Sequence, residues 1–86
     1  MKLKKELYLR KICDEYILVP TGKTVDMFNG LFYLTESGAR IFEAIEQGKE
    51  KPQIIKALLE EFDVDEKTAE DDYSAFIAQL EKFDII

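Results

Sequence analysis

The chain has 86 residues, of which 47% are hydrophobic and 35% charged, and its formal net charge is −6. A chain of this size can form one small core, and its apolar content excludes an intrinsically disordered protein. No apolar run is long enough to span a bilayer, and residues 1–6 lack the apolar stretch of a signal peptide. We therefore expect one domain, 1–86, with a frayed segment 1–6, in the cytoplasm. A single cysteine, Cys13, fits that reducing compartment.

The charge is distributed unevenly along the chain. Residues 1–23 contain six Lys or Arg and three acidic residues, whereas residues 24–86 contain six and fifteen. Nucleic-acid binding requires a basic surface that neutralises phosphates, so the acidic balance argues against it. A basic or amphipathic peptide, or a protein surface, is the better match.

The first predicted elements are two strands. Apolar and charged residues mix over 7–13, and β-branched and aromatic residues fill 16–19 before the stop at Pro20. We expect the turn between the two strands at Asp14-Glu15.

A third strand is predicted at Leu31–Leu34, where four apolar or aromatic residues follow the turn signal Asn29-Gly30. The preceding segment, Lys23–Phe28, fits either a strand or an irregular flap. The strand itself has two interpretations. A central strand buried on both faces would have this composition, but so would an open edge kept for a partner, because the stretch lacks the Lys or Pro that usually protects edges.

Three helices are predicted after the strands. The first begins near Thr35 and ends at Gly48, the second has Pro52 as its first residue, and the third is capped by Asp65. Their apolar stripes are Gly38, Ile41, Phe42 and Ile45; then Ile54, Ile55, Leu58, Leu59 and Phe62; then Ala69, Tyr73, Phe76, Ile77, Leu80 and Phe83. The predicted fold class is α+β, a three-stranded antiparallel sheet followed by three helices in a winged-helix-like arrangement.

The sequence offers little catalytic chemistry. It contains no histidine, so Ser37 and Ser74 have no triad partner, and its four glycines are isolated rather than grouped in a phosphate-binding loop. Cys13 has no activating imidazole and is expected as a small buried or half-buried strand residue. The acidic run 60–66 fails as a calcium loop because Lys67 would occupy a ligand position. We therefore expect a non-enzyme without a metal, a cofactor or catalytic residues.

The third predicted helix carries candidate binding residues. We expect Phe76 in the core and Tyr73 at the rim of a groove, because a tyrosine hydroxyl needs water or a partner. Asp72, next to Tyr73, could hold a basic residue of an incoming peptide. Which other side chains of this helix face the groove stays open.

Four stretches that follow one another along the chain carry a resemblance to a known family. They are Ile17-Leu18-Val19-Pro20-x-Gly22, Phe28-Asn29-Gly30-Leu31, Leu34-Thr35-Glu36-Ser37-Gly38-Ala39-x-Ile41-Phe42 and Asp72-Tyr73-x-x-Phe76-Ile77-x-x-Leu80. In this order and spacing they resemble the PqqD family, named for pyrroloquinoline quinone biosynthesis and also called RiPP recognition elements. The resemblance extends from about Tyr8 to Ile86. The family often has Asn where Thr35 stands and Gly near Phe83.

The resemblance implies a peptide-binding module. Members of this family hold the leader segment of a ribosomally synthesised precursor peptide and present it to a modifying enzyme, often a radical SAM protein of the SPASM type. The leader is added as a strand beside the third strand, in a groove bounded by the third helix. Carried to this chain, the peptide-binding residues are Leu31, Phe32, Tyr33, Leu34, Asp72, Tyr73 and Phe76. The backbone of Leu31–Tyr33 is then the docking edge, and Leu34, Ile41 and Phe42 belong to the core.

Two other functions remain as alternatives. The open edge could pair with a second copy of the chain, which makes a monomer or a weak homodimer the expected state. A winged-helix nucleic-acid binder is less favoured because residues 60–72 are rich in acid. We expect neither nucleic acid nor a membrane as a partner.

Overall fold

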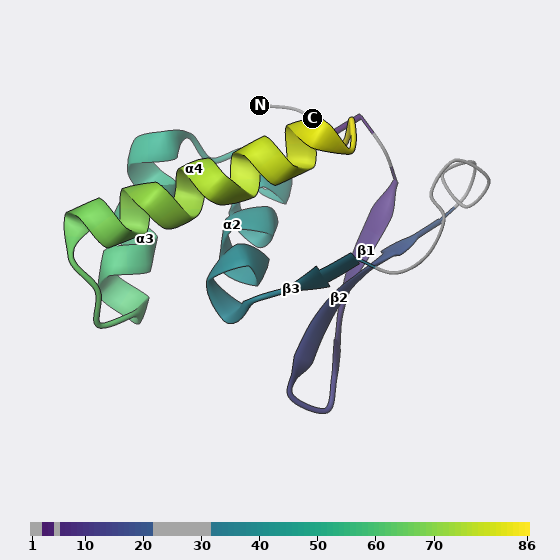
Figure 1. The fold of residues 1–86 in the computed structure, drawn as a ribbon, viewed down its shortest axis with the longest axis horizontal. Coiled ribbons are helices and arrows are strands. Elements are labelled where there is room, and N and C mark those ends of the chain that lie inside the picture. Colours follow the sequence, from purple (N-terminus) through teal and green to yellow (C-terminus); the bar gives the residue numbers. More distant parts are fainter. Residues whose placement is uncertain (1–2, 5, 22–31) are drawn as a thin grey trace.

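The computed structural model describes residues 3–4, 6–21 and 32–86, which form a sheet packed against helices (Figure 1). The elements of this part are β1 (Leu7–Ile12), β2 (Glu15–Pro20), β3 (Phe32–Leu34), α2 (Glu36–Glu46), α3 (Lys51–Glu61) and α4 (Glu66–Lys82). The α+β class and the order of strands followed by helices are therefore confirmed. The segment Lys23–Phe28 and residue Leu31 lie outside the described residues.

The three strands form one antiparallel sheet in the order β1-β2-β3. Ile12 pairs with Glu15, so the hairpin loop consists of Cys13 and Asp14. The predicted turn was wrong by one residue, because Glu15 already belongs to β2. Cys13 adopts a left-handed backbone conformation with φ 57°, as tight two-residue hairpin loops require. Its predicted place in a strand is also wrong, since the side chain is exposed at the hairpin tip.

The core lies between the inner face of the sheet and the three helices. Its largest fully buried side chains come from β2, from all three helices and from the C-terminal residues; they are Leu18, Ile41, Phe42, Ile54, Leu80 and Ile85. Leu34 is partly buried and packs against this cluster. The prediction that Leu34, Ile41 and Phe42 belong to the core is confirmed.

The helix boundaries follow the capping residues of the sequence. Thr35 Oγ1 accepts a hydrogen bond from Gly38 N at 3.1 Å, and Asp65 Oδ1 accepts one from Thr68 N at 2.8 Å. Both caps satisfy backbone donors that a helix leaves unpaired at its start. α3 begins at Lys51, one residue before the predicted start at Pro52.

The two ends of the described chain lie side by side (Figure 1). Lys4 N donates to Ile85 O at 2.6 Å, and Lys4 Nζ lies 3.1 Å from Asp84 Oδ1. Leu3 also packs against the core. Leu3 and Lys4 thus contact the rest of the described chain, and the fraying of residues 1–6 stays a prediction. Among the described residues, no helix has the length and apolar character needed to cross a bilayer.

Candidate functional site

β3 is an edge strand. Among the described residues it pairs with β2 and with no other strand, so in this part of the chain it has the position of an edge strand rather than of a central one. Its side chains alternate as expected for a strand. Phe32 is 6% exposed on the core side, and Tyr33 is 60% exposed on the outer side.

The hydrogen-bond pattern of β2 shows which of its backbone groups face β3. Thr21 N donates to Glu6 O at 3.0 Å just beyond the β1–β2 ladder. Hydrogen-bonded and non-bonded pairs alternate along an antiparallel ladder. With the observed register, Tyr16 and Leu18 therefore direct their backbone groups away from β1 and toward β3.

The same alternation leaves the backbone of Tyr33 at the open edge. Leu34 lies opposite Tyr16 and Phe32 lies opposite Leu18, so these two residues of β3 bond to β2. Tyr33, opposite Ile17, turns its N–H and C=O outward. An unpaired donor and acceptor at a sheet edge form a template for an added strand.

A groove begins where β3 ends and runs along α4. Its first hollow, of about 210 Å³, is formed by the start of α2 and one face of α4; it is lined by Thr35, Ser37, Gly38, Asp72, Ala75, Phe76 and Gln79. Gly38 allows this close packing, because a Cβ there would lie 3.3 Å from the ring of Phe76.

A second hollow continues the groove toward the end of α3. It measures about 250 Å³ and is lined by Thr35, Glu36, Ser37, Leu58, Phe62, Val64, Ala69 and Asp72. The two hollows share Thr35, Ser37 and Asp72, which therefore stand between them. Ser37 and Thr35 are within hydrogen-bonding distance of each other, with 3.2 Å between their hydroxyl oxygens.

The lining of both hollows is apolar apart from hydroxyls, one amide and two carboxylates. Asp72 and Glu36 supply the carboxylates, and none of the lining residues is Lys or Arg. Among the described residues, no group of three or more His, Cys, Asp or Glu could hold a metal ion. The groove can therefore accept apolar side chains and a positive charge.

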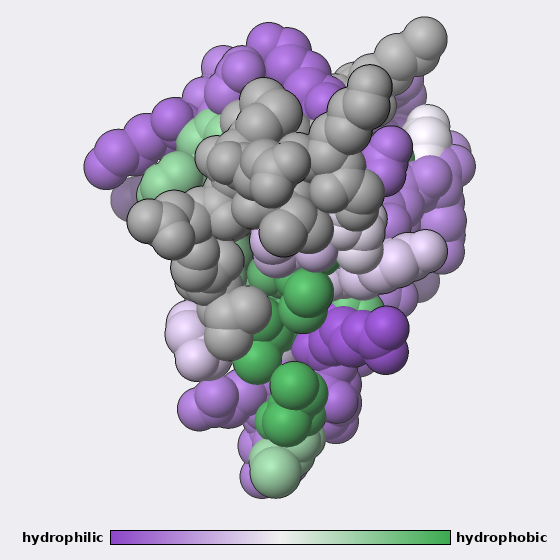
Figure 2. Space-filling view, turned by 90° about the vertical axis from the view of Figure 1, so that its right-hand side faces the viewer, coloured by the Kyte–Doolittle hydropathy of each residue, from purple (hydrophilic) through white to green (hydrophobic). Residues whose placement is uncertain are grey.

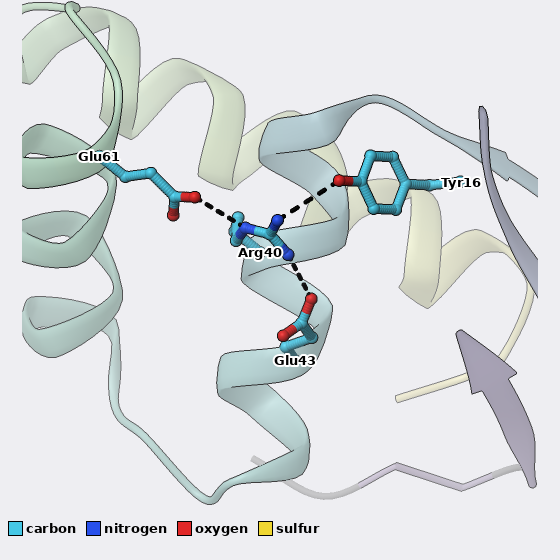
Figure 3. A network of polar contacts seen from close by, with 4 residues as sticks. All are labelled: Tyr16, Arg40, Glu43 and Glu61. Atoms are coloured by element: carbon cyan, nitrogen blue, oxygen red, sulfur yellow. Dashed lines mark hydrogen bonds and ion pairs between the residues drawn. The ribbon is translucent and has the colours of Figure 1, made fainter. Parts of the chain in front are cut away.

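The sheet is joined to the helices by a polar network around Arg40 (Figure 3). Arg40 on α2 donates to Glu61 of α3 at 2.8 Å, to Glu43 of its own helix, and to the Tyr16 hydroxyl of β2 at 3.3 Å. Hydrogen bonding to Glu61 raises the pKa of Arg40 above its ordinary value. One side chain thus connects three elements that position β3.

The family model of coenzyme PQQ synthesis protein D matches residues 15–86. The chain belongs to the PqqD family. A solved structure described as TbiB1 in complex with the TbiA(beta) leader peptide is similar over 99% of this chain and 93% of that one, with 29% sequence identity and a TM-score of 0.76. The comparison with curated proteins gives no match.

In this PqqD-family chain, the structure brings some of the predicted site residues together. Asp72 is exposed and borders both hollows, and Phe76 is buried and lines the first. Phe32, Tyr33 and Leu34 form β3 as predicted, whereas Leu31 lies outside the described residues. Contact of these residues with a peptide stays a prediction.

Tyr73 does not lie at the groove, and its predicted rim position is wrong. Its side chain is 6% exposed, and Lys51 Nζ at the start of α3 lies 5.7 Å from its ring. Burial, and then the negative charge of Glu50, raise the pKa of Tyr73. Successive helix residues are separated by about 100° around the axis, so Asp72 and Tyr73 point to different surroundings.

Sequence reasoning missed part of the lining of this PqqD-family groove. On α4 the lining residues are Asp72, Ala75, Phe76 and Gln79, which follow the i, i+3, i+4, i+7 spacing of one helix face. That spacing could have identified Ala75 and Gln79. In the second hollow, Phe62 follows Leu58 at the i+4 spacing of the second predicted helix, whereas Val64 carries no such signal because it lies in the loop after α3.

Phe83 was predicted in the apolar stripe of the third helix, but α4 ends before it. The residue is 43% exposed, and its ring contacts Phe32 edge-on with 5.1 Å between the centroids. This contact joins the end of α4 to β3. Figure 2 views the molecule from the side of the sheet and shows hydrophobic residues reaching the surface there.

Proposed function

We propose that this chain is a non-catalytic module that binds the leader segment of a ribosomally synthesised precursor peptide. The leader would pair with β3 as an added strand and place side chains in the groove beside α4, which is β-augmentation. The observation that carries the proposal is the outward N–H and C=O of Tyr33 at the edge that leads into the two hollows. Membership of the PqqD family and the likeness to a leader-bound structure support it.

The free energies expected from backbone hydrogen bonds and from buried apolar side chains differ, so the edge and the groove would have different roles in binding. A net contribution of about 0.5–1.5 kcal/mol per hydrogen bond makes the two groups of Tyr33 a modest source of affinity. Burying an apolar side chain contributes about 1.5–3 kcal/mol, and the groove has two hollows for such side chains. The backbone would therefore set orientation, and the hollows would supply most of the affinity and selectivity.

The modifying enzyme that receives the bound leader is proposed to be a radical SAM protein, on the basis of the family resemblance. We expect the purified chain alone to leave the precursor peptide unchanged. Together with the enzyme, it should raise the rate of peptide modification. An equal rate with and without the chain would exclude this presenting role.

A titration followed by NMR tests peptide capture directly. The probe is the synthetic leader segment of the precursor peptide encoded beside the gene for this chain. The control is a peptide of the same composition in scrambled order. Amides of Tyr33 and of residues 72–79 should shift with the leader, while Leu9 on the opposite edge should not. If only Leu9 and its neighbours shift, or no amide shifts, the assigned site is wrong.

Self-association through the same edge is distinguishable from peptide capture. A dimer formed by pairing β3 with β3 would compete with the leader for Tyr33. Sedimentation at several concentrations should then show a dimer that the leader dissociates. A species whose mass does not change with concentration or with leader would exclude this alternative.

A further inference from the structure

We propose that the groove selects peptide segments with a Lys or Arg between two apolar anchor residues, and that Asp72 binds the cation. This inference rests on the proposed function, because it concerns the peptide that the same edge would capture. It goes further by stating which residue types the peptide must carry. Backbone register, the lining of the hollows and the surroundings of Asp72 each support it.

The register of β3 determines which side chains of an added strand enter the groove. A peptide residue paired with Tyr33 has its side chain on the outer side of the sheet, where the Tyr33 side chain lies. Its two neighbours point to the opposite side, as Phe32 and Leu34 do on β3. That is the side of α4, since Phe32 contacts Phe83 at the end of that helix.

Each hollow offers an apolar site for an anchor residue. The first presents the ring of Phe76 above Gly38, with Ala75 beside them. The second presents the side chains of Leu58, Phe62, Val64 and Ala69. Aliphatic or aromatic side chains are the residues that gain free energy in such sites.

Between the hollows, Asp72 is the polar group left for a ligand. The hydroxyl of Thr35 accepts the cap hydrogen bond from Gly38 N at 3.1 Å and also contacts the hydroxyl of Ser37. Asp72 is exposed and forms no ion pair within the described part of the chain. By contrast, Glu43 and Glu61 are both held by Arg40.

The charge around Asp72 favours a cation over an anion. Glu36 adds a second carboxylate to the lining of the second hollow, and no lining residue carries a positive charge. A peptide carboxylate placed between the anchors would be repelled, whereas an ammonium or guanidinium group would be attracted. For a partly exposed pair of this kind, the two effects together correspond to roughly a 5-fold preference for Lys or Arg over Glu.

An array of 12-residue synthetic peptides tests the inference. Each peptide carries two apolar anchors, Leu or Phe, at positions i and i+4, with Lys, Arg, Gln or Glu at i+2, because only alternate residues of an added strand face the groove. The wild-type chain should bind the Lys and Arg peptides about 5-fold better than the Glu peptides. This preference should decrease in 1 M salt, where charges are screened within about 3 Å.

Two variants separate a local contact from the net charge of the protein. Asp72→Lys should reverse the order so that Glu peptides bind best. Asp71→Lys makes the same change in net charge at an exposed neighbour that lines neither hollow, and it should keep the wild-type order. If Asp72→Lys keeps the wild-type order, or Asp71→Lys also reverses it, Asp72 is not the selecting group.

The outcomes also distinguish this inference from the proposed function. Equal binding of Lys, Gln and Glu peptides by the wild-type chain would overturn the charge rule and leave peptide capture intact. If no peptide of the array binds the wild-type chain, although the leader shifts the amide signal of Tyr33, the proposed anchor pattern is wrong. If the leader fails to bind at all, the proposed function fails and the inference fails with it.

Discussion

The two edges of the sheet differ in length, in charge and in their neighbours. β1 has six residues and includes Arg10 and Lys11, whereas β3 has three residues and no charged one. Charged residues on an edge, Lys above all, discourage pairing with another chain. β3 lacks this protection and leads into the hollows beside α4. This difference in charge supports β3, rather than β1, as the edge that we propose for peptide docking.

The backbone pattern makes this comparison specific. On β1 the groups that face outward belong to Leu7, Leu9 and Lys11, because the alternate residues bond to β2. On β3 they belong to Tyr33. Lys11 Nζ also lies 5.6 Å from the ring centroid of Tyr16 on β2. Within the described residues, the sheet thus has one edge strand that carries Arg and Lys and one that carries no charged residue.

The largest loss of stability is expected from a substitution of Leu18, which lies on β2, the strand that pairs with both β1 and β3. Leu18 is 0% exposed, and Leu18→Ala removes buried methyl groups and leaves a cavity, at a cost of about 2–5 kcal/mol. In a domain whose total stability is about 5–15 kcal/mol, both edges should lose order together. Urea unfolding measures the change, and Leu59→Ala at the exposed face of α3 serves as the control. A Leu18→Ala loss no larger than that of Leu59→Ala would contradict the assigned core.

Proline placed at each edge separates their roles in binding. Tyr33→Pro removes the outward N–H of β3 without removing a bond to β2, so leader binding should fall by roughly 2- to 13-fold. Leu9→Pro makes the corresponding change on β1 and should leave the affinity unchanged. Isothermal titration with the leader measures both variants, after circular dichroism has verified their folds. Similar losses in the two variants would mean that β3 is not the preferred edge. Phe32→Pro is less informative, because Phe32 bonds to β2.

Much of the fold was predictable because local residues determine it. Thr35 and Asp65 act as caps at the predicted positions, and the β-branched run before Pro20 forms β2. The hairpin loop was predicted one residue late, since Cys13 is an uncommon residue for a left-handed backbone position. Propensity could not identify that position.

The candidate site was less predictable because it depends on how distant elements meet. Asp72 and Phe76 were identified from the sequence, but Tyr73 was assigned to the groove although it packs toward Lys51. The apolar stripe of the third predicted helix is too wide to show which of its sides contacts another element. The contribution of Phe62 and Val64 requires the packing of α3 on α2 and α4, which no local pattern contains.

A smaller effect is expected from the cap at the start of α4, because the other end of that helix is the one that contacts β3. Hydrogen bonding from Thr68 lowers the pKa of Asp65. The stabilisation is therefore complete above the ordinary carboxyl pKa of about 4 and is lost as the pH falls through the lower folded-state value. Asp65→Ala should be less stable than the wild type at pH 7, and the difference should disappear in acid. Thermal unfolding between pH 2 and 7 measures this, with Asp63→Ala as the control. A difference that persists at pH 2 would exclude the charged cap as its cause.

The smallest loss of stability is expected at Arg40, which contacts the sheet through the hydroxyl of Tyr16 on β2, the strand between the two edges (Figure 3). Its ion pairs with Glu43 and Glu61 are partly exposed, and such pairs contribute at most about 1 kcal/mol each. Arg40→Met keeps much of the side-chain volume and should lower stability by about 1 kcal/mol, with a smaller loss in 1 M salt. Because the network joins the sheet to the helices without lining either hollow, leader affinity should change less than in Tyr33→Pro. If Arg40→Met weakens binding as strongly as Tyr33→Pro while the fold is retained, the position of the whole sheet, rather than the β3 edge alone, controls peptide capture.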